Sequence, residues 1–148
     1  MADFVLIGVN LLARRIVLAI TAALGLSVGL WAALFPRVFF TSFPGFGLHW
    51  IDESGAFDEH LIRDVGGLYL ALVAITIAAF FTRALIAARL AGLGWTVFNV
   101  IHFAFHVTHL PPALVDVVGN MVSLGLSLIL GVLLLLPERT TSNSKGNQ

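Results

Sequence analysis

The stretch ALVDVVGNMVSLGLSLILGVLLLL, residues 113–136, contains one charged side chain and is followed by Pro137. About 20 consecutive apolar residues are enough for a helix to cross the hydrocarbon core of a membrane, so this stretch predicts a membrane span. Three other stretches share its character and are bounded by arginine or proline: residues 16–35, 61–81 and 90–110. The chain therefore predicts four spans whose ends are set by charge and proline.

The composition of the whole chain predicts the same fold class. Of its 148 residues, 59% are hydrophobic and 11% are charged, and the mean hydropathy is +1.00. Soluble domains carry charge on about a quarter of their residues. We therefore expect an all-α, integral membrane four-helix bundle in contact with a lipid bilayer. The absence of cysteine excludes a disulfide framework, a thiolate metal site and a dithiol redox pair.

The positive charges predict the orientation of the spans. The basic side chains collect at one end of the predicted bundle, namely Arg14, Arg15, Arg83, Arg89, Arg139 and Lys145. Only Arg37 and Arg63 fall at the other end. Because the cytoplasmic side of a membrane protein is enriched in Lys and Arg, both termini are expected in the cytoplasm. The net charge of zero argues against a nucleic-acid partner, which would favour a basic excess.

The chain divides into three parts. Residues 1–15 form an N-terminal segment that either lies in the interface or extends the first span into the cytoplasm. Residues 16–136 form the bundle and include an outer loop, residues 36–60, whose aromatic and glycine residues suit the membrane interface. Trp31, near the end of the first span, and Trp50, in the loop, are the expected interface anchors. Residues 137–148 are polar and predict a disordered cytoplasmic tail.

Small residues recur every four positions in two spans. The first span has Gly25 and Gly29, and the fourth has a longer stripe of Gly119, Ser123, Ser127 and Gly131. Such stripes let helix backbones approach closely in lipid. They favour a compact bundle, and an interface to a second copy of the chain explains either stripe equally well.

Polar residues gather in the outer half of the predicted bundle. In the third span, Asn99, His102, His106 and His109 share one helix face. In the second span, His60 and Asp64 are four residues apart, and the fourth span carries Asp116 and Asn120 at the same spacing. At a rise of about 1.5 Å per residue these groups lie at similar depths. If the three spans pack together, the side chains converge in one pocket beneath the outer loop.

Imidazole and carboxylate together suit a transition metal, and ionisable groups within a membrane are functional candidates. The predicted ligands of a Zn, Fe or Cu ion are His60, Asp64, His102, His106 and Asp116. Haem b held between His60 and His106 and a proton or quinol site are the less favoured cofactor hypotheses. A plainer alternative is equally open, in which these histidines bond to loop backbone and water and Asp64 neutralises Arg63.

Three segments carry a resemblance to known proteins: Phe43-Pro-Gly-Phe-Gly-Leu-His-Trp, Glu59-His-Leu-Ile-Arg-Asp-Val-Gly-Gly-Leu-Tyr-Leu and Val100-Ile-His-Phe-Ala-Phe-His-Val-Thr-His. The chain resembles small four-helix membrane proteins of actinobacteria whose function is unassigned, and in layout it is similar to the wider DoxX-like superfamily. The resemblance implies a bundle in a bacterial plasma membrane and a redox-linked role. It supplies no catalytic motif.

Two functional hypotheses follow. The first is an outward-facing His/Asp pocket that binds a transition metal or small ligand, with or without catalysis. The second is a non-catalytic interaction or assembly subunit of a larger membrane complex, or of a homo-oligomer. The sequence has no phosphate-binding loop, dinucleotide fingerprint or HExxH motif, so the NTPase and nicotinamide-dependent classes have no support.

Overall fold

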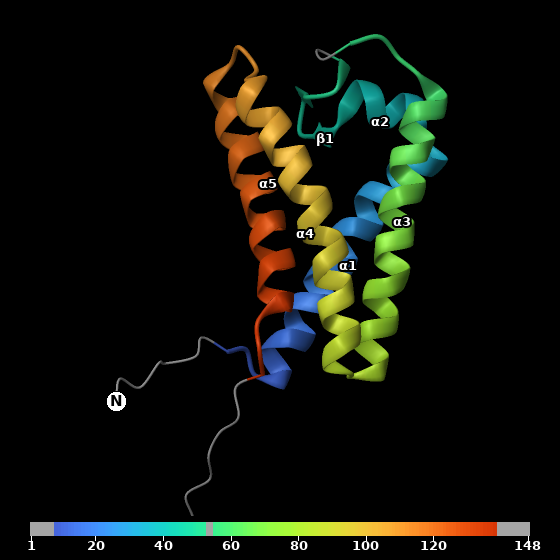
Figure 1. Ribbon diagram of the computed structural model, residues 1–148. Coiled ribbons are helices and arrows are strands. Elements are labelled where there is room, and N and C mark those ends of the chain that lie inside the picture. The colour runs from blue at the N-terminus through green and yellow to red at the C-terminus, as the bar shows by residue number, and fades with distance from the viewer. Residues whose placement is uncertain (1–7, 53–54, 139–148) are drawn as a thin grey trace, which may run out of the picture.

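The computed structural model describes residues 8–52 and 55–138, and helices make up most of this part of the chain (Figure 1). The elements follow in the order α1 (Leu11–Leu34), α2 (Pro36–Ser42), β1 (Pro44–Gly45), β2 (Leu48–His49), α3 (Glu59–Thr82), α4 (Leu85–Thr108) and α5 (Leu114–Leu135). Helices α1, α3, α4 and α5 are each long and apolar enough to cross a membrane. The fold is therefore the all-α four-helix bundle that the sequence predicts.

The helix boundaries lie close to the predicted spans, except that α1 and α4 each begin five residues earlier than expected, so that Arg89 lies within α4. Helix α1 begins at Leu11, five residues before the expected start, because the side chain of Asn10 accepts a hydrogen bond from the amide of Ala13 and caps the helix. Asp58 caps α3 in the same way through the amide of Leu61. Of the predicted tail, residues 139–148 lie outside the described residues, as do residues 1–7 of the N-terminal segment.

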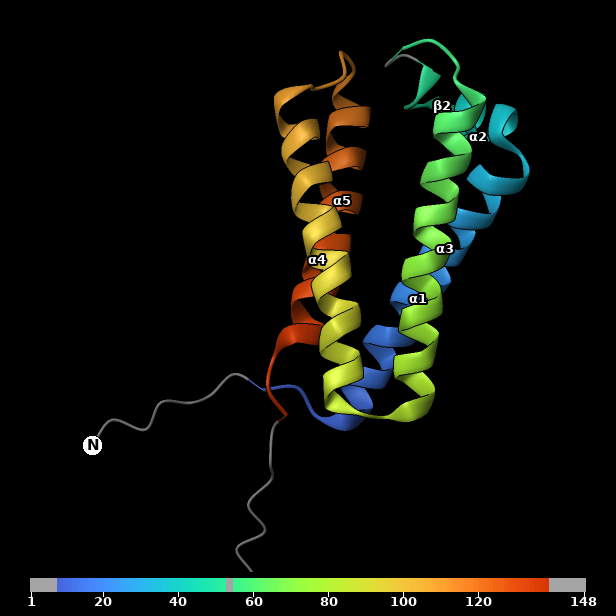
Figure 2. The ribbon, with the colours of Figure 1, turned by 45° about the vertical axis from the view of Figure 1, so that its right-hand side comes forward.

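The four long helices pack chiefly as two pairs, α1 with α3 and α4 with α5. Glycines allow the close approach of the helices in both pairs. A Cβ at Gly66 of α3 would lie 2.5 Å from the backbone nitrogen of Ala33 in α1, and a Cβ at Gly92 of α4 would lie 2.9 Å from the carbonyl oxygen of Gly131 in α5. Backbones therefore meet directly in each pair, as the small residues predict. Figures 1 and 2 show the two pairs diverging toward the end that carries α2, which we call the loop end.

Most residues of the small-residue stripes pack against other parts of the same chain. Gly25 accommodates the ring of Trp95 and a methyl group of Val73, and Gly29 lies against Leu70 and Tyr69. Gly119 faces the ring of Trp50. The glycines of both stripes are therefore covered within the chain, whereas Ser123 of α5 is exposed.

A polar contact joins α4 to α5 in the middle of the bundle. The amide nitrogen of Asn99 donates to the carbonyl oxygen of Ser127 at 3.3 Å, and the Ser127 hydroxyl donates to the Asn99 amide oxygen at 3.0 Å. Asn99 is almost fully buried. An amide in the membrane interior that lost these partners would be left with unsatisfied hydrogen-bonding groups, which is costly. The pair therefore fixes the register of the two helices.

A double-mutant cycle with Asn99→Ala and Ser127→Ala should give a coupling free energy of about 1 kcal/mol, the size typical of hydrogen bonds between helices in membranes. The measurement is unfolding of the detergent-solubilised protein by SDS. Additive effects of the two single changes would contradict the assigned pairing. Thr108→Ala serves as the control, since the hydroxyl of Thr108 bonds to backbone within its own helix.

The opposite end of the bundle, which we call the terminal end, joins the first helix to the last. The guanidinium of Arg14 donates to the carbonyl oxygen of Leu136 at 2.9 Å and to the carboxylate of Glu138 at 3.3 Å. The amide of Val9 also donates to the carbonyl oxygen of Pro137. Arg14 is therefore buried but paired, although the sequence placed it in a segment outside the bundle.

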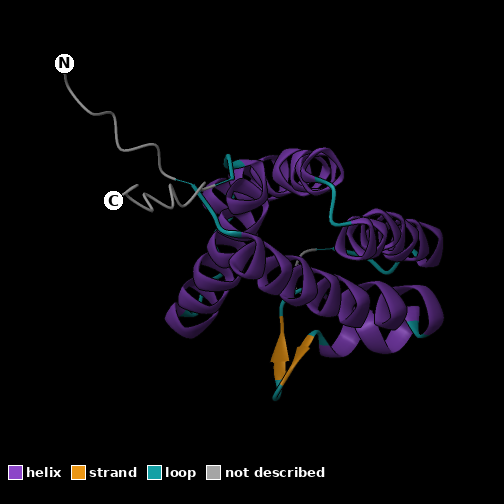
Figure 3. Cartoon of the chain, turned by 90° about the horizontal axis from the view of Figure 1, so that it is seen from below, coloured by secondary structure: helices purple, strands orange, loops and turns teal. Residues whose placement is uncertain are grey.

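The predicted outer loop folds into the short helix α2 and a two-stranded hairpin, β1 paired antiparallel with β2. Gly45 and Gly47 have positive φ angles at the hairpin turn, a conformation that glycine adopts without strain. Figure 3 shows the two strands at one side of the helices when the molecule is seen from below. An aromatic cluster of Trp31, Phe39 and Phe43 packs α2 against the end of α1.

Candidate functional site

Three of the five histidines have polar partners within the chain. His49 bonds to the carbonyl oxygen of Thr41 at 2.7 Å and lies 3.5 Å from the carboxylate of Asp52. The Nδ1 atom of His109 lies 3.0 Å from the carbonyl oxygen of Phe105. His60 forms the predicted pair with Asp64 at 3.3 Å, but both side chains are largely exposed. These three histidines fit the plainer hypothesis of local hydrogen bonding.

His102 and His106 differ from the other three. Their rings lie edge to face with centroids 4.8 Å apart, which confirms that the two residues are neighbours on one face of α4. Both are half-buried. Within the described residues, neither ring has a hydrogen-bond partner, whereas a neutral imidazole offers one donor and one acceptor. Together the pair presents four ring nitrogens for a ligand.

The histidine pair continues a column of aromatic rings along α4. The ring of His102 stacks on Phe98, with centroids 5.3 Å apart and planes inclined by 19°. Phe98 in turn meets Tyr69 of α3 at 5.1 Å, and Tyr69 meets Trp95 at 5.6 Å. These contacts mark where α3 and α4 meet. His102 lies one turn beyond Phe98, toward the loop end of α4.

Trp95 anchors the lower end of this column. Its Nε1 donates to the hydroxyl of Thr76 at 2.8 Å, and that hydroxyl donates to the carbonyl oxygen of Leu72 at 2.7 Å. The indole is 2% exposed. Because the α3 contacts fix Trp95, the rings above it on α4 also have a defined position.

Asp116 has a different environment from the other predicted ligands. Its Oδ1 accepts a hydrogen bond from Nε1 of Trp50 at 2.8 Å, and its carbonyl oxygen accepts one from the Asn120 amide at 2.9 Å. The Trp50 ring also covers Gly119. Trp50 and Asp116 therefore fasten the loop to α5, a partnership that the sequence does not reveal because 66 residues separate the two positions.

The predicted five-residue metal site is thus divided in the structure. His60 pairs with Asp64, His102 with His106, and Asp116 with Trp50. Across residues 8–52 and 55–138, no three histidine or carboxylate side chains are placed to hold one metal ion. Glu53, another acid of the outer loop, lies outside the described residues.

Searches against protein-family models, curated proteins and solved structures give no match to this chain.

Proposed function

We propose that this multi-pass membrane protein binds a small ligand at the His102–His106 pair. The observation that carries the proposal is the presence of two adjacent, half-buried imidazoles without hydrogen-bond partners among the described residues, in a helix that crosses the membrane. A half-buried polar ring gains free energy when a partner satisfies it. The other three histidines already have such partners, so the feature distinguishes this pair.

The surroundings of the pair favour a flat ligand with hydrogen-bonding oxygens, such as a quinone. Phe98 provides a ring face on one side of His102, and exposed apolar residues of α4, including Ile101 and Phe105, face the lipid. Aromatic walls with a few polar groups are typical of small-molecule sites. A quinone reaches such a site from the bilayer. A redox-linked role would follow from this ligand and agrees with the DoxX-like resemblance.

A transition metal is the second candidate, because two histidines at positions i and i+4 of a helix can bind one ion. A Zn, Fe or Cu ion on His102 and His106 would need further ligands, for which Asp64, His60 or Asp116 would have to leave their present partners. Haem b between His60 and His106 is less favoured, since the side chain of His60 is 88% exposed.

The charge distribution supports an orientation with both termini in the cytoplasm, and a bacterial plasma membrane is the location that the resemblance implies. Among the described residues, Arg14, Arg15, Arg83 and Arg89 belong to the terminal end, and Arg37 and Arg63 belong to the loop end. The histidine pair would then lie in the outer half of the membrane. An assembly subunit is the alternative function. Most positions of the small-residue stripes are covered within the chain, but Ser123 of α5 is exposed.

The test is a titration of the protein in nanodiscs with a short-chain ubiquinone, followed by quenching of tryptophan fluorescence. The ring centroids of Trp95 and Phe98 are 6.4 Å apart, so a quinone bound beside Phe98 and His102 should quench the fluorescence of Trp95. We expect saturable quenching, and a His102→Ala/His106→Ala variant should bind at least about tenfold more weakly, since two hydrogen bonds are lost.

His109→Ala is the matched control, because it removes a histidine from the same helix that already has a backbone partner. Equal affinity in the double variant and the wild type would refute a quinone at this pair. Elemental analysis of the same preparations tests the second candidate. Stoichiometric Zn, Fe or Cu that is lost only in the double variant would replace the quinone with a metal.

A further inference from the structure

The terminal end of the bundle carries more positive charge than its partners neutralise. Arg14, Arg15, Arg83 and Arg89 lie there, and Glu138 is the only acid that the structure describes at this end. Glu138 pairs with Arg14. Within residues 8–52 and 55–138, the buried Nε atoms of Arg15 and Arg89 have no hydrogen-bond partner. A buried guanidinium donor without an acceptor is costly, so an anion at this end would stabilise the protein.

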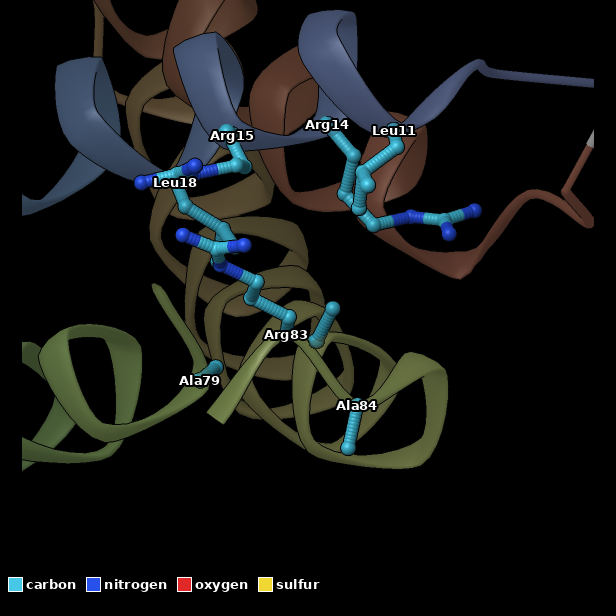
Figure 4. Close-up of a pocket in the computed structure, with 8 residues that line it drawn as sticks. Leu11, Arg14, Arg15, Leu18, Ala79, Arg83 and Ala84 are labelled. Carbon is cyan, nitrogen blue, oxygen red and sulfur yellow. The ribbon is translucent and has the colours of Figure 1, made fainter. Parts of the chain in front are cut away.

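A small cavity lies among these arginines. It has about 10 Å³ of free volume, enough for one oxygen atom, and lies between α1 and the turn that joins α3 to α4. Its lining is Leu11, Arg14, Arg15, Leu18, Ala79, Arg83, Ala84 and Ala88. Figure 4 shows the guanidinium groups of Arg15 and Arg83 on the same side of the cavity, while Arg14 extends away from them. Two guanidinium groups that line one cavity are suited to donate hydrogen bonds to the oxygens of one phosphate.

A second cavity lies next to the first, between α1 and α3. It has about 150 Å³ of free volume, and its lining is entirely apolar: Leu18, Ala19, Ala22, Ile77, Phe80 and Phe81. Leu18 lines both cavities. The guanidinium of Arg15 lies 4.6 Å above the ring of Phe80, so it stands where the polar cavity meets the apolar one. From the arginines, the second cavity extends toward the middle of α1 and α3, and we call it the apolar groove.

We propose that the two cavities together form a binding site for an anionic phospholipid. The phosphate group would accept hydrogen bonds from Arg15 and Arg83, and an acyl chain would lie over Ala19 and Ala22. Basic sites between helices at a membrane surface bind lipid headgroups in this way. A free phosphate ion would use the arginines alone. The apolar groove that adjoins them is therefore the feature that favours a lipid over a soluble anion.

The experiment is native mass spectrometry of the full-length protein in detergent, titrated with dioleoylphosphatidylglycerol. The wild type should retain one lipid at low lipid concentration, and dioleoylphosphatidylcholine should bind at least about tenfold more weakly. Arg15→Gln/Arg83→Gln should weaken retention of phosphatidylglycerol by a similar factor. Arg37→Gln is the control, because Arg37 also lies over an aromatic ring, Phe57, but at the loop end.

Two further measurements separate a lipid from a free anion. Ala22→Phe fills the apolar groove without changing any charge, so it should weaken phosphatidylglycerol binding at unchanged thermal stability. Inorganic phosphate at millimolar concentration should not displace the lipid. Retention that is equal in wild type and Arg15→Gln/Arg83→Gln would overturn the site. Retention unaffected by Ala22→Phe, or displacement by phosphate, would overturn the assignment to a lipid.

Discussion

Replacing Gly66 by alanine should lower the melting temperature of the detergent-solubilised protein by about 5 °C, which corresponds to about 2 kcal/mol for a chain of this size. A Cβ at this position would lie 2.5 Å from the backbone nitrogen and 2.9 Å from the Cα of Ala33. Backbone cannot rotate away as a flexible side chain can, so α1 and α3 would have to separate along their main contact. Thermal unfolding followed by circular dichroism measures the effect.

The adjacent glycine provides the matched control. A Cβ at Gly67 would have nothing within 4 Å, although both residues lie in α3. Gly67→Ala should therefore leave the melting temperature unchanged or raise it slightly, because alanine favours helix over glycine by about 1 kcal/mol. Similar melting temperatures for the two variants would show that α1 and α3 do not meet at Gly66.

Trp95→Ala should have the largest effect on stability, lowering the free energy of unfolding by about 3–5 kcal/mol. The ring is 2% exposed and fills the space that Gly25 of α1 leaves, while Tyr69 of α3 lies against it. Its loss would leave a cavity where three helices meet. Unfolding by SDS in mixed micelles measures the change.

Trp95→Phe separates the packing of this residue from its hydrogen bond. Phenylalanine keeps an aromatic ring but cannot donate to Thr76, so we expect a loss of about 1 kcal/mol from the missing bond plus a smaller packing defect. Equal losses for Trp95→Phe and Trp95→Ala would assign the whole effect to the hydrogen bond. That result would contradict the packing role.

The spans follow from the sequence because membrane thickness fixes their length and because prolines and arginines mark their ends. Pro137 closes α5 within two residues of the predicted boundary. The start of α1 could not be predicted from charge and proline in this way. Arg14 and Arg15 indicate a membrane boundary, yet Arg14 is buried because its partners come from the far end of the chain.

The candidate site is only partly visible in the sequence. Spacing along one helix places His102 beside His106 and His60 beside Asp64, and the structure confirms both pairs. Whether different helices bring such pairs together depends on how the helices are rotated and how far they diverge. Periodicity contains no information on either quantity. For the same reason the contact of Trp50 with Asp116, which joins a loop to a distant helix, could not be predicted.

The pairing of Arg14 also sets an order for the assembly of the bundle. The acceptors of this guanidinium, Leu136 and Glu138, lie more than 120 positions later and are synthesised well after it. Until they emerge from the ribosome, the Arg14 guanidinium lacks these acceptors, and a buried charge without a partner is costly. The contact between the start of α1 and the end of α5 can therefore form only after α5 is complete, so a chain truncated before Leu136 would leave Arg14 without these partners.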